Sequence, residues 1–179
     1  MQPQDAARPD DQPEHPNCAA VRTAASALGL DITIVTYPEG TRTADDAAAA
    51  IGCSVAQIVK SLIFLVDGVP TLALVAGSNQ LDEKKLATAA GGAKTKRADA
   101  DQVREATGFP IGGVPPFAHR QRLPTYVDPD LLSHDEVWAA GGTAHTVFAL
   151  APGALVAATG GRAVDRLRAA SRRCATVGP

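Results

Sequence analysis

Apolar residues recur along this chain at either helical or strand spacing, and the pattern predicts a single α+β domain. Helical spacing, with glycine as a stop signal, predicts helices at about 17–28, 44–51, 55–59, 81–90, 99–106 and 152–159. Runs of β-branched and other apolar residues predict strands at 32–37, 61–66, 71–76, 123–127, 136–139 and 146–150. Because helices and strands mix without regular alternation, we expect a mixed, largely antiparallel sheet curled into a barrel-like core with flanking helices.

Two pairs of these strands are predicted hairpins. Asp67–Gly68 is a strong turn signal between the strands at 61–66 and 71–76. Both strands are apolar on both faces, so we expect this pair at the centre of the sheet. Gly141–Gly142 predicts a second hairpin between the last two strands.

An apolar loop rich in glycine and proline, residues 107–119, follows the helix predicted at 99–106. A flexible linker would be polar, whereas glycine and proline interleave here with apolar residues. The loop is therefore expected to form a rigid wall whose Gly112 and Gly113 amides can point at an oxygen, with an ordinary buried turn as an equal alternative. Lys60, which opens an otherwise apolar strand, is the second candidate; its alternative role is that of a strand-end lysine that reaches solvent.

The length of 179 residues suggests one domain, and the net charge of −2 excludes a global basic field. A nucleic-acid partner would therefore have to bind a local basic patch, whose alternative is a solvated helix face. The candidate residues are Lys84, Lys85, Lys94, Lys96 and Arg97, with Arg120 and Arg122 as further members.

The predicted domain spans residues 17–160. Residues 1–16 contain almost nothing to bury and are expected to form a disordered N-terminal extension. Residues 161–179 form an Arg- and Ala-rich C-terminal tail, which we expect either to extend as a helix or to fray.

The three cysteines, Cys18, Cys53 and Cys174, are widely spaced and form no Cys-x-x-Cys pair. A disulfide framework or a zinc site is therefore not expected, and neither is any other metal or cofactor. No apolar run of about 18 residues and no signal-peptide pattern occurs, so we expect a cytoplasmic protein that does not contact a membrane.

Four motifs in this order resemble the YbaK/prolyl-tRNA synthetase-associated domain family: Lys60–Ser61–Leu62, the LDEKKL segment at 81–86, the GGVPPF segment at 112–117, and Gly141–Gly142. The resemblance extends over roughly residues 17–159. Members of this family are aminoacyl-tRNA deacylases, which hydrolyse the ester of a tRNA charged with the wrong amino acid. The resemblance implies a YbaK-like fold and, since the sequence contains no synthetase segment, a free-standing enzyme that edits in trans.

The resemblance also implies a site. It places the family's essential lysine at Lys60 and its glycine-rich loop at Gly112 and Gly113. The residues implied in substrate binding are Tyr37, Ser61, Val114, Pro115, Pro116, Phe117 and His145.

Four positions bear on substrate choice within the family. Pro115 and Ala118 stand where many members have serine and glycine. Val147 stands where the cysteine-removing members have aspartate, and His145 resembles a histidine of the prolyl-synthetase insertion and its alanine-removing relatives. The implied substrate is tRNA(Pro) that carries cysteine, alanine or another small residue, with His145 holding the substrate amino group or a water. A histidine that caps a strand end is the equal alternative.

The chemistry that such residues can perform follows from the substrate. An aminoacyl ester is already activated, so the protein must place a water or the vicinal ribose hydroxyl and stabilise the oxyanion that forms. Backbone donors such as the Gly112 and Gly113 amides are commonly worth about 3 kcal/mol each, and Lys60 adds a positive charge. Ser78 and Asn79 are further candidate hydrogen-bond donors.

The expected partners are the acceptor end of mischarged tRNA and, as a further candidate, prolyl-tRNA synthetase. The protein is expected to be a monomer or a weak dimer. Two other functions remain open at this point. The first is a non-catalytic module that binds an aminoacyl or nucleotide end. The second is a cysteine hydrolase that uses Cys53, which lies at a helix start where a thiolate can be stabilised.

Overall fold

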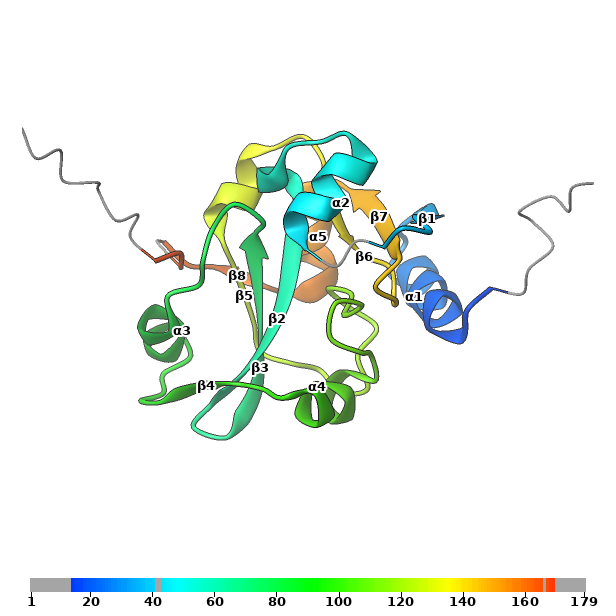
Figure 1. Ribbon diagram of the computed structural model, residues 1–179. Coiled ribbons are helices and arrows are strands. Elements are labelled where there is room, and N and C mark those ends of the chain that lie inside the picture. Colours follow the sequence, from blue (N-terminus) through cyan, green and yellow to red (C-terminus); the bar gives the residue numbers. More distant parts are fainter. Residues whose placement is uncertain (1–13, 41–42, 166, 170–179) are drawn as a thin grey trace, which may run out of the picture.

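The computed structural model describes residues 14–40, 43–165 and 167–169 (Figure 1). Its helices are α1 (Pro16–Ala27), α2 (Ala44–Ile51), α3 (Glu83–Ala89), α4 (Ala100–Thr107) and α5 (Pro152–Thr159), with the 3₁₀ turns η2 (Val55–Gln57) and η3 (Pro129–Ser133). Its strands are β1 (Ile34–Thr36), β2 (Val59–Val66), β3 (Val69–Ala76), β4 (Thr95–Arg97), β5 (Thr125–Val127), β6 (Val137–Ala140), β7 (Thr146–Leu150) and β8 (Arg162–Ala163).

The strands form two sheets. The larger has the order β4-β2-β3-β5-β8; β4 is antiparallel to β2, whereas β5 and β8 add in parallel beyond β3. The smaller, β1-β7-β6, is antiparallel throughout. One isolated bridge, from Ile58 to Trp138, joins the start of β2 to β6. The expected α+β domain is confirmed, and so are both hairpins, with β2 and β3 at the centre of the larger sheet.

The barrel-like core is not confirmed. In the described part of the chain the strands divide between two sheets and do not close. The edge strands β4 and β8 have only three and two residues, so they offer few backbone groups for pairing with strands of the other sheet. The strands β1, β6 and β7 satisfy their backbone groups by pairing with one another instead.

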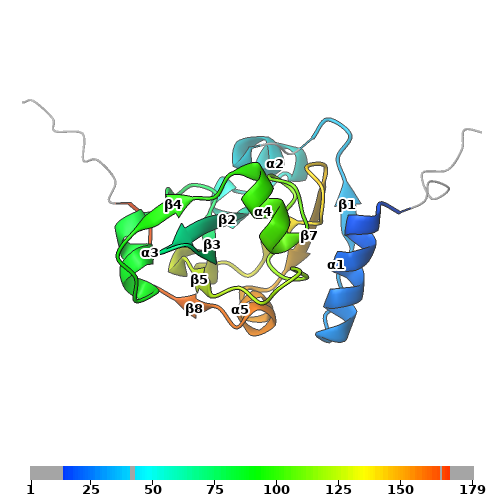
Figure 2. The same ribbon diagram turned by 90° about the horizontal axis from the view of Figure 1, so that it is seen from below.

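Alternation along β2 places its neighbouring residues on opposite faces of the sheet. Val59 and Ile63 belong to the main core cluster, which also contains Phe148 of β7. Phe64 and Val66 belong to a second cluster with Leu86 of α3. Figures 1 and 2 accordingly place α1 and α3 at opposite sides of the molecule, with the β2-β3 hairpin between them. Lys60 and Ser61 therefore leave the strand on different faces.

Local signals define most helix boundaries. At the start of α2, Thr43 accepts from the Asp46 amide while the Asp46 carboxylate accepts from the Thr43 amide, which satisfies two donors of the first turn. Gly52 ends the helix with φ of 82°. The helix expected at 55–59 is shorter than predicted: only η2 forms, and β2 already begins at Val59. Lys60 is consequently the second residue of the strand rather than its first.

The chain ends differ from the expectation where they are described. Helix α1 begins at Pro16, and the rest of the expected extension, residues 1–13, lies outside the described residues. In the expected tail, β8 pairs with β5 and Leu167 is fully buried, so this part is neither helical nor frayed. Residues 166 and 170–179 lie outside the description. No described helix is long and apolar enough to span a bilayer.

Candidate active site

A cavity of about 400 Å³ lies where α2, the first half of β2, β6 and the glycine–proline loop after α4 meet. This volume is within the usual range for small-molecule sites, roughly 300–1,000 Å³. Lys60 and Ser61 line it from β2, and Gly112 and Val114 line it from the loop. Residues of the β2 strand and of the loop, which are far apart in the sequence, thus contribute to the lining of one cavity.

Lys60 is half-buried, and its Nζ donates a hydrogen bond to the backbone carbonyl of Asn79. Burial lowers the pKa of the Lys60 amine from its ordinary value of 10.5, while the carboxylates of Asp128 and Asp45 oppose this shift. The Arg97 guanidinium, which lines the same cavity, lowers that pKa further. The cavity wall thus carries two cationic groups, Lys60 and Arg97, and one carboxylate, Asp45.

The two glycines of the loop have different environments. Gly112 lines the cavity with φ of 85°, and its amide donates to no other described residue. The Gly113 amide, in contrast, donates to the Pro110 carbonyl at 3.0 Å. A Cβ on Gly113 would lie 2.8 Å from Thr143 Cα, so glycine allows close packing against the β6-β7 turn. Of the two amides proposed to bind an oxygen, Gly112 is the one available in this structure.

The rest of the loop supports the cavity wall from behind. Val114 lines the cavity, whereas Pro115, Pro116 and Phe117 are buried and are not among its lining residues. The Phe117 ring packs against Phe148 with centroids 5.7 Å apart. The loop is thus a packed wall, in accord with its predicted rigidity, and three of its expected substrate contacts lie outside the cavity lining.

Tyr37 and His145 lie together but are not among the lining residues. The Tyr37 amide donates to the His145 carbonyl at 2.8 Å, which continues the pairing of β1 with β7. His145 is exposed on the turn before β7, beside Ala144, whose Cβ would be 3.7 Å from a Cβ on Gly112. Val147 lines the cavity and is 5% exposed, so the position at which an aspartate is expected in the cysteine-removing members is apolar in this chain.

The Ser61 hydroxyl is the one buried side-chain polar atom in the described residues without a hydrogen-bond partner. Buried polar groups normally have partners because leaving one unpaired is unfavourable. Since Ser61 lines the cavity, a ligand there can supply the missing partner.

The basic residues expected to bind tRNA do not share one environment. Arg97 lines the cavity, whereas Lys84 and Lys85 of α3 line a separate hollow with Asp82 and Asp165. Lys85 also pairs with Asp82 at 3.5 Å. Nearby carboxylates therefore reduce the positive potential at α3, and Arg97 is the member of the expected tRNA-binding set that lines the cavity.

Cys53 does not support thiol catalysis. Burial raises the pKa of the Cys53 thiol from its ordinary value of 9.0, which disfavours the reactive thiolate. Cys53 packs at the edge of a small apolar cluster around Ala47 and Ile58 and is not among the residues that line the cavity.

Sequence reasoning missed several residues of the site. From the sequence, Asp45 is recognisable only as an acidic residue in the first turn of a helix, and Trp138 only as a strand residue. In the structure both residues line the cavity, and so does the exposed Ile111. Asn79 was expected to donate to a ligand, but it is not among the lining residues and instead accepts from Lys60. Because every residue type has a backbone carbonyl, a contact of this kind cannot be recognised from the sequence.

Comparisons with known proteins place the chain in a family. The pattern of the aminoacyl-tRNA editing domain family matches residues 38–158. The chain is 35% identical over 103 residues to a proline--tRNA ligase of Maridesulfovibrio salexigens, in a match that covers 57% of this chain and 17% of the ligase. It is 27% identical over 127 residues to the "Putative Cys-tRNA(Pro)/Cys-tRNA(Cys) deacylase EbsC" of Enterococcus faecalis, covering 70% of this chain and 77% of that protein. The chain also superposes on the crystal structure of a "putative trans-editing enzyme for prolyl tRNA synthetase" with a TM-score of 0.81 and 44% identity, over 86% of this chain and 98% of that one.

Proposed function

The chain belongs to the aminoacyl-tRNA editing domain family, and from this premise we propose that it is a trans-acting deacylase that hydrolyses the ester of mischarged tRNA. The proposed substrate is tRNA(Pro) that carries alanine, cysteine or another small residue. One observation carries the proposal: Lys60 of β2 and Gly112 of the distant loop line one cavity. The similarity to the "putative trans-editing enzyme for prolyl tRNA synthetase" over 98% of its length supports action in trans.

The cavity offers what ester hydrolysis requires. As a water attacks the ester carbon, negative charge develops on the carbonyl oxygen; the bond from that carbon to the ribose oxygen then breaks, and the ribose oxygen leaves as a hydroxyl with a proton that comes from the water. The Gly112 amide and the Lys60 ammonium are the donors for that oxygen, and loss of one such donor typically costs about 3 kcal/mol of transition-state stabilisation. The Ser61 hydroxyl, which lacks a protein partner, is the proposed contact for the attacking oxygen or the ribose.

The walls of the cavity support a small substrate residue. Val114, Ala140 and Val147 form apolar lining that can contact a short side chain. Arg97 is the proposed contact for the terminal phosphate of the acceptor end, because a guanidinium binds phosphate oxygens in a bidentate manner. Prolyl-tRNA synthetase is a further proposed partner, on the strength of the relatives above.

The test is deacylation of tRNA(Pro) charged separately with alanine, cysteine, serine or proline. We expect faster loss of at least one small non-cognate ester than of prolyl-tRNA(Pro). Lys60→Ala should lower kcat/KM roughly 100-fold or more, because the charge is lost at the reacting centre. Arg104→Ala removes an exposed charge on α4, outside the cavity lining, and should retain wild-type activity.

Absence of enzyme-dependent loss of all four esters would refute the proposed reaction. Wild-type activity in folded Lys60→Ala would instead refute the proposed site.

A further inference from the structure

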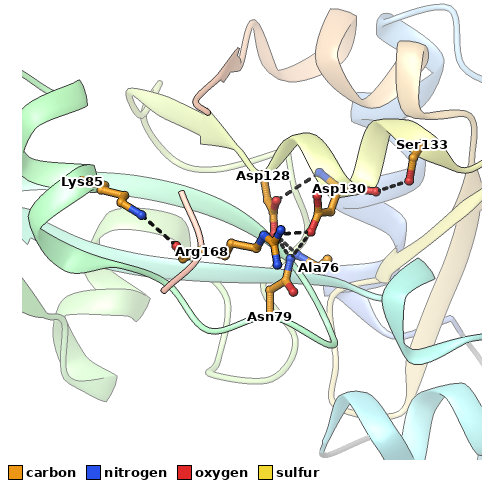
Figure 3. A network of polar contacts seen from close by, with 7 residues as sticks. All are labelled: Ala76, Asn79, Lys85, Asp128, Asp130, Ser133 and Arg168. Carbon is orange, nitrogen blue, oxygen red and sulfur yellow. Dashed lines mark hydrogen bonds and ion pairs between the residues drawn. The ribbon is translucent and has the colours of Figure 1, made fainter. Parts of the chain in front are cut away.

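A network of hydrogen-bonded polar residues contacts Asn79 (Figure 3), whose backbone carbonyl accepts from Lys60 Nζ, and the chemistry proposed above does not use this network. Its centre is Asp128, between β5 and η3, which is 1% exposed and is the one carboxylate in the buried core of the described chain. One carboxylate oxygen accepts from the Ala76 amide at 3.2 Å and from the Asn79 side-chain amide at 2.8 Å. The other accepts from the Asp130 amide at 3.1 Å. Both oxygens of the buried carboxylate thus accept hydrogen bonds.

Asn79 is held at both its side chain and its backbone. A side-chain amide nitrogen has two protons to donate. In Asn79 this nitrogen donates to Asp128 at 2.8 Å and to Asp130 at 2.7 Å, and the backbone amide donates to the Ala76 carbonyl at 2.9 Å. These contacts hold Asn79, whose backbone carbonyl oxygen accepts the hydrogen bond from Lys60 Nζ.

We propose that Asn79 is a positioning residue for Lys60, held in place by Asp128 and Asp130, and that it aims the Lys60 ammonium into the cavity. The proposal rests on the proposed function. A lysine ammonium has three donors on a flexible four-carbon stem, so it does not adopt one position without an anchor. The Asn79 carbonyl takes one donor and leaves two for the substrate.

The charges around Lys60 fit this role. Burial lowers the pKa of the amine and Arg97 of β4 acts in the same direction, whereas Asp128 and Asp45 of α2 favour the charged form. Asp128 therefore both orients Asn79 and helps to keep the amine protonated. Arg168 contacts Asp130 at 3.3 Å, but both side chains are about half exposed, so this ion pair contributes little.

The test compares Asn79→Ala with Gln80→Ala, its exposed neighbour on the same turn. Asn79→Ala removes both contacts to the carboxylates. We expect a fall in kcat of about 10- to 100-fold with nearly unchanged KM, because small displacements of a catalytic group have effects of this size. Gln80→Ala should retain the wild-type kcat. Circular dichroism establishes that each variant is folded.

An activity-independent readout is the rate at which acetic anhydride acetylates Lys60, measured by peptide mass spectrometry as a function of pH. Release of the ammonium from its anchor should make Lys60 of Asn79→Ala react faster than in the wild type, and Gln80→Ala should leave the rate unchanged. This readout still tests the anchor if the wild type deacylates none of the four esters, so the two proposals can fail separately.

A second variant, Asp130→Ala, removes only the half-exposed carboxylate and should give a smaller loss of kcat in the same direction. It decides the matter if Asn79→Ala does not fold. Folded Asn79→Ala, or Asp130→Ala in its place, with wild-type kcat and wild-type Lys60 acetylation would overturn the proposal.

Discussion

Replacing Gly113 with alanine tests whether the glycine–proline loop must pack directly on the β6-β7 turn. A Cβ at this position would lie 2.8 Å from Thr143 Cα, 2.9 Å from the Gly142 carbonyl oxygen and 3.0 Å from the Gly142 carbonyl carbon. All three neighbours are backbone atoms, so no side chain can rotate away. The φ of Gly113 is outside the left-handed region, so the effect of the substitution is steric and not conformational.

The expected magnitude follows from the cost of overpacking. Forcing extra atoms into a packed site typically costs about 1–3 kcal/mol. For a chain of this size each kcal/mol lowers Tm by roughly 2–4 °C, so Gly113→Ala should melt about 2–12 °C below the wild type. Separation of the loop from the turn also displaces the neighbouring Gly112 amide, and kcat should fall by up to roughly 100-fold.

Gly153→Ala is the matched control. Gly153 lies in the first turn of α5, and a Cβ there would meet no atom within 4 Å. The control should keep its activity and gain up to about 1 kcal/mol of stability, because alanine favours the helix over glycine. Urea unfolding and deacylation of the preferred ester measure both effects. A Gly113→Ala protein as stable and as active as the wild type would show that the loop does not depend on this close approach.

Two further predictions concern the end of the same loop. Ala118 adopts φ of 72°, a conformation that costs a non-glycine residue about 1–2 kcal/mol. Ala118→Gly should therefore raise the free energy of unfolding by about 0.5–1 kcal/mol, after the greater entropy of glycine in the unfolded chain is subtracted. A free energy of unfolding below that of the wild type, measured in urea, would contradict this. Burial lowers the pKa of His119 below its ordinary 6.5, although its contact with the Pro115 carbonyl opposes the shift. The unfolded chain therefore binds this proton more readily, and stability present above pH 6.5 should be lost as pH falls through the folded pKa. His119→Gln should reduce that loss between about pH 7.5 and about pH 5, and an equal loss in both proteins would rule out His119 as its source.

Residue patterns predicted the elements that surround the site better than they predicted its contacts. The β2-β3 hairpin was recognisable because Asp67–Gly68 is a turn signal and both strands are apolar. The short strand β4 was not, because its residues Thr95–Arg97 are polar and its pairing depends on β2. Lys60 and Gly112 could be assigned to one site only through the family resemblance, since no spacing rule relates residues so far apart.

The local sequence specifies where helices begin and end, which strands pair as hairpins and that the glycine–proline loop is stiff, because capping, turn geometry and burial periodicity act over a few residues. Contacts between distant segments decide the rest. They divide the strands into two sheets, and they leave Gly112 at the cavity while the Gly113 amide bonds within its own turn. They also join Lys60 to Asn79 and Asn79 to Asp128, pairs that are 19 and 49 residues apart in the sequence. Such contacts depend on the position of the whole backbone, which the pattern of neighbouring residues does not encode.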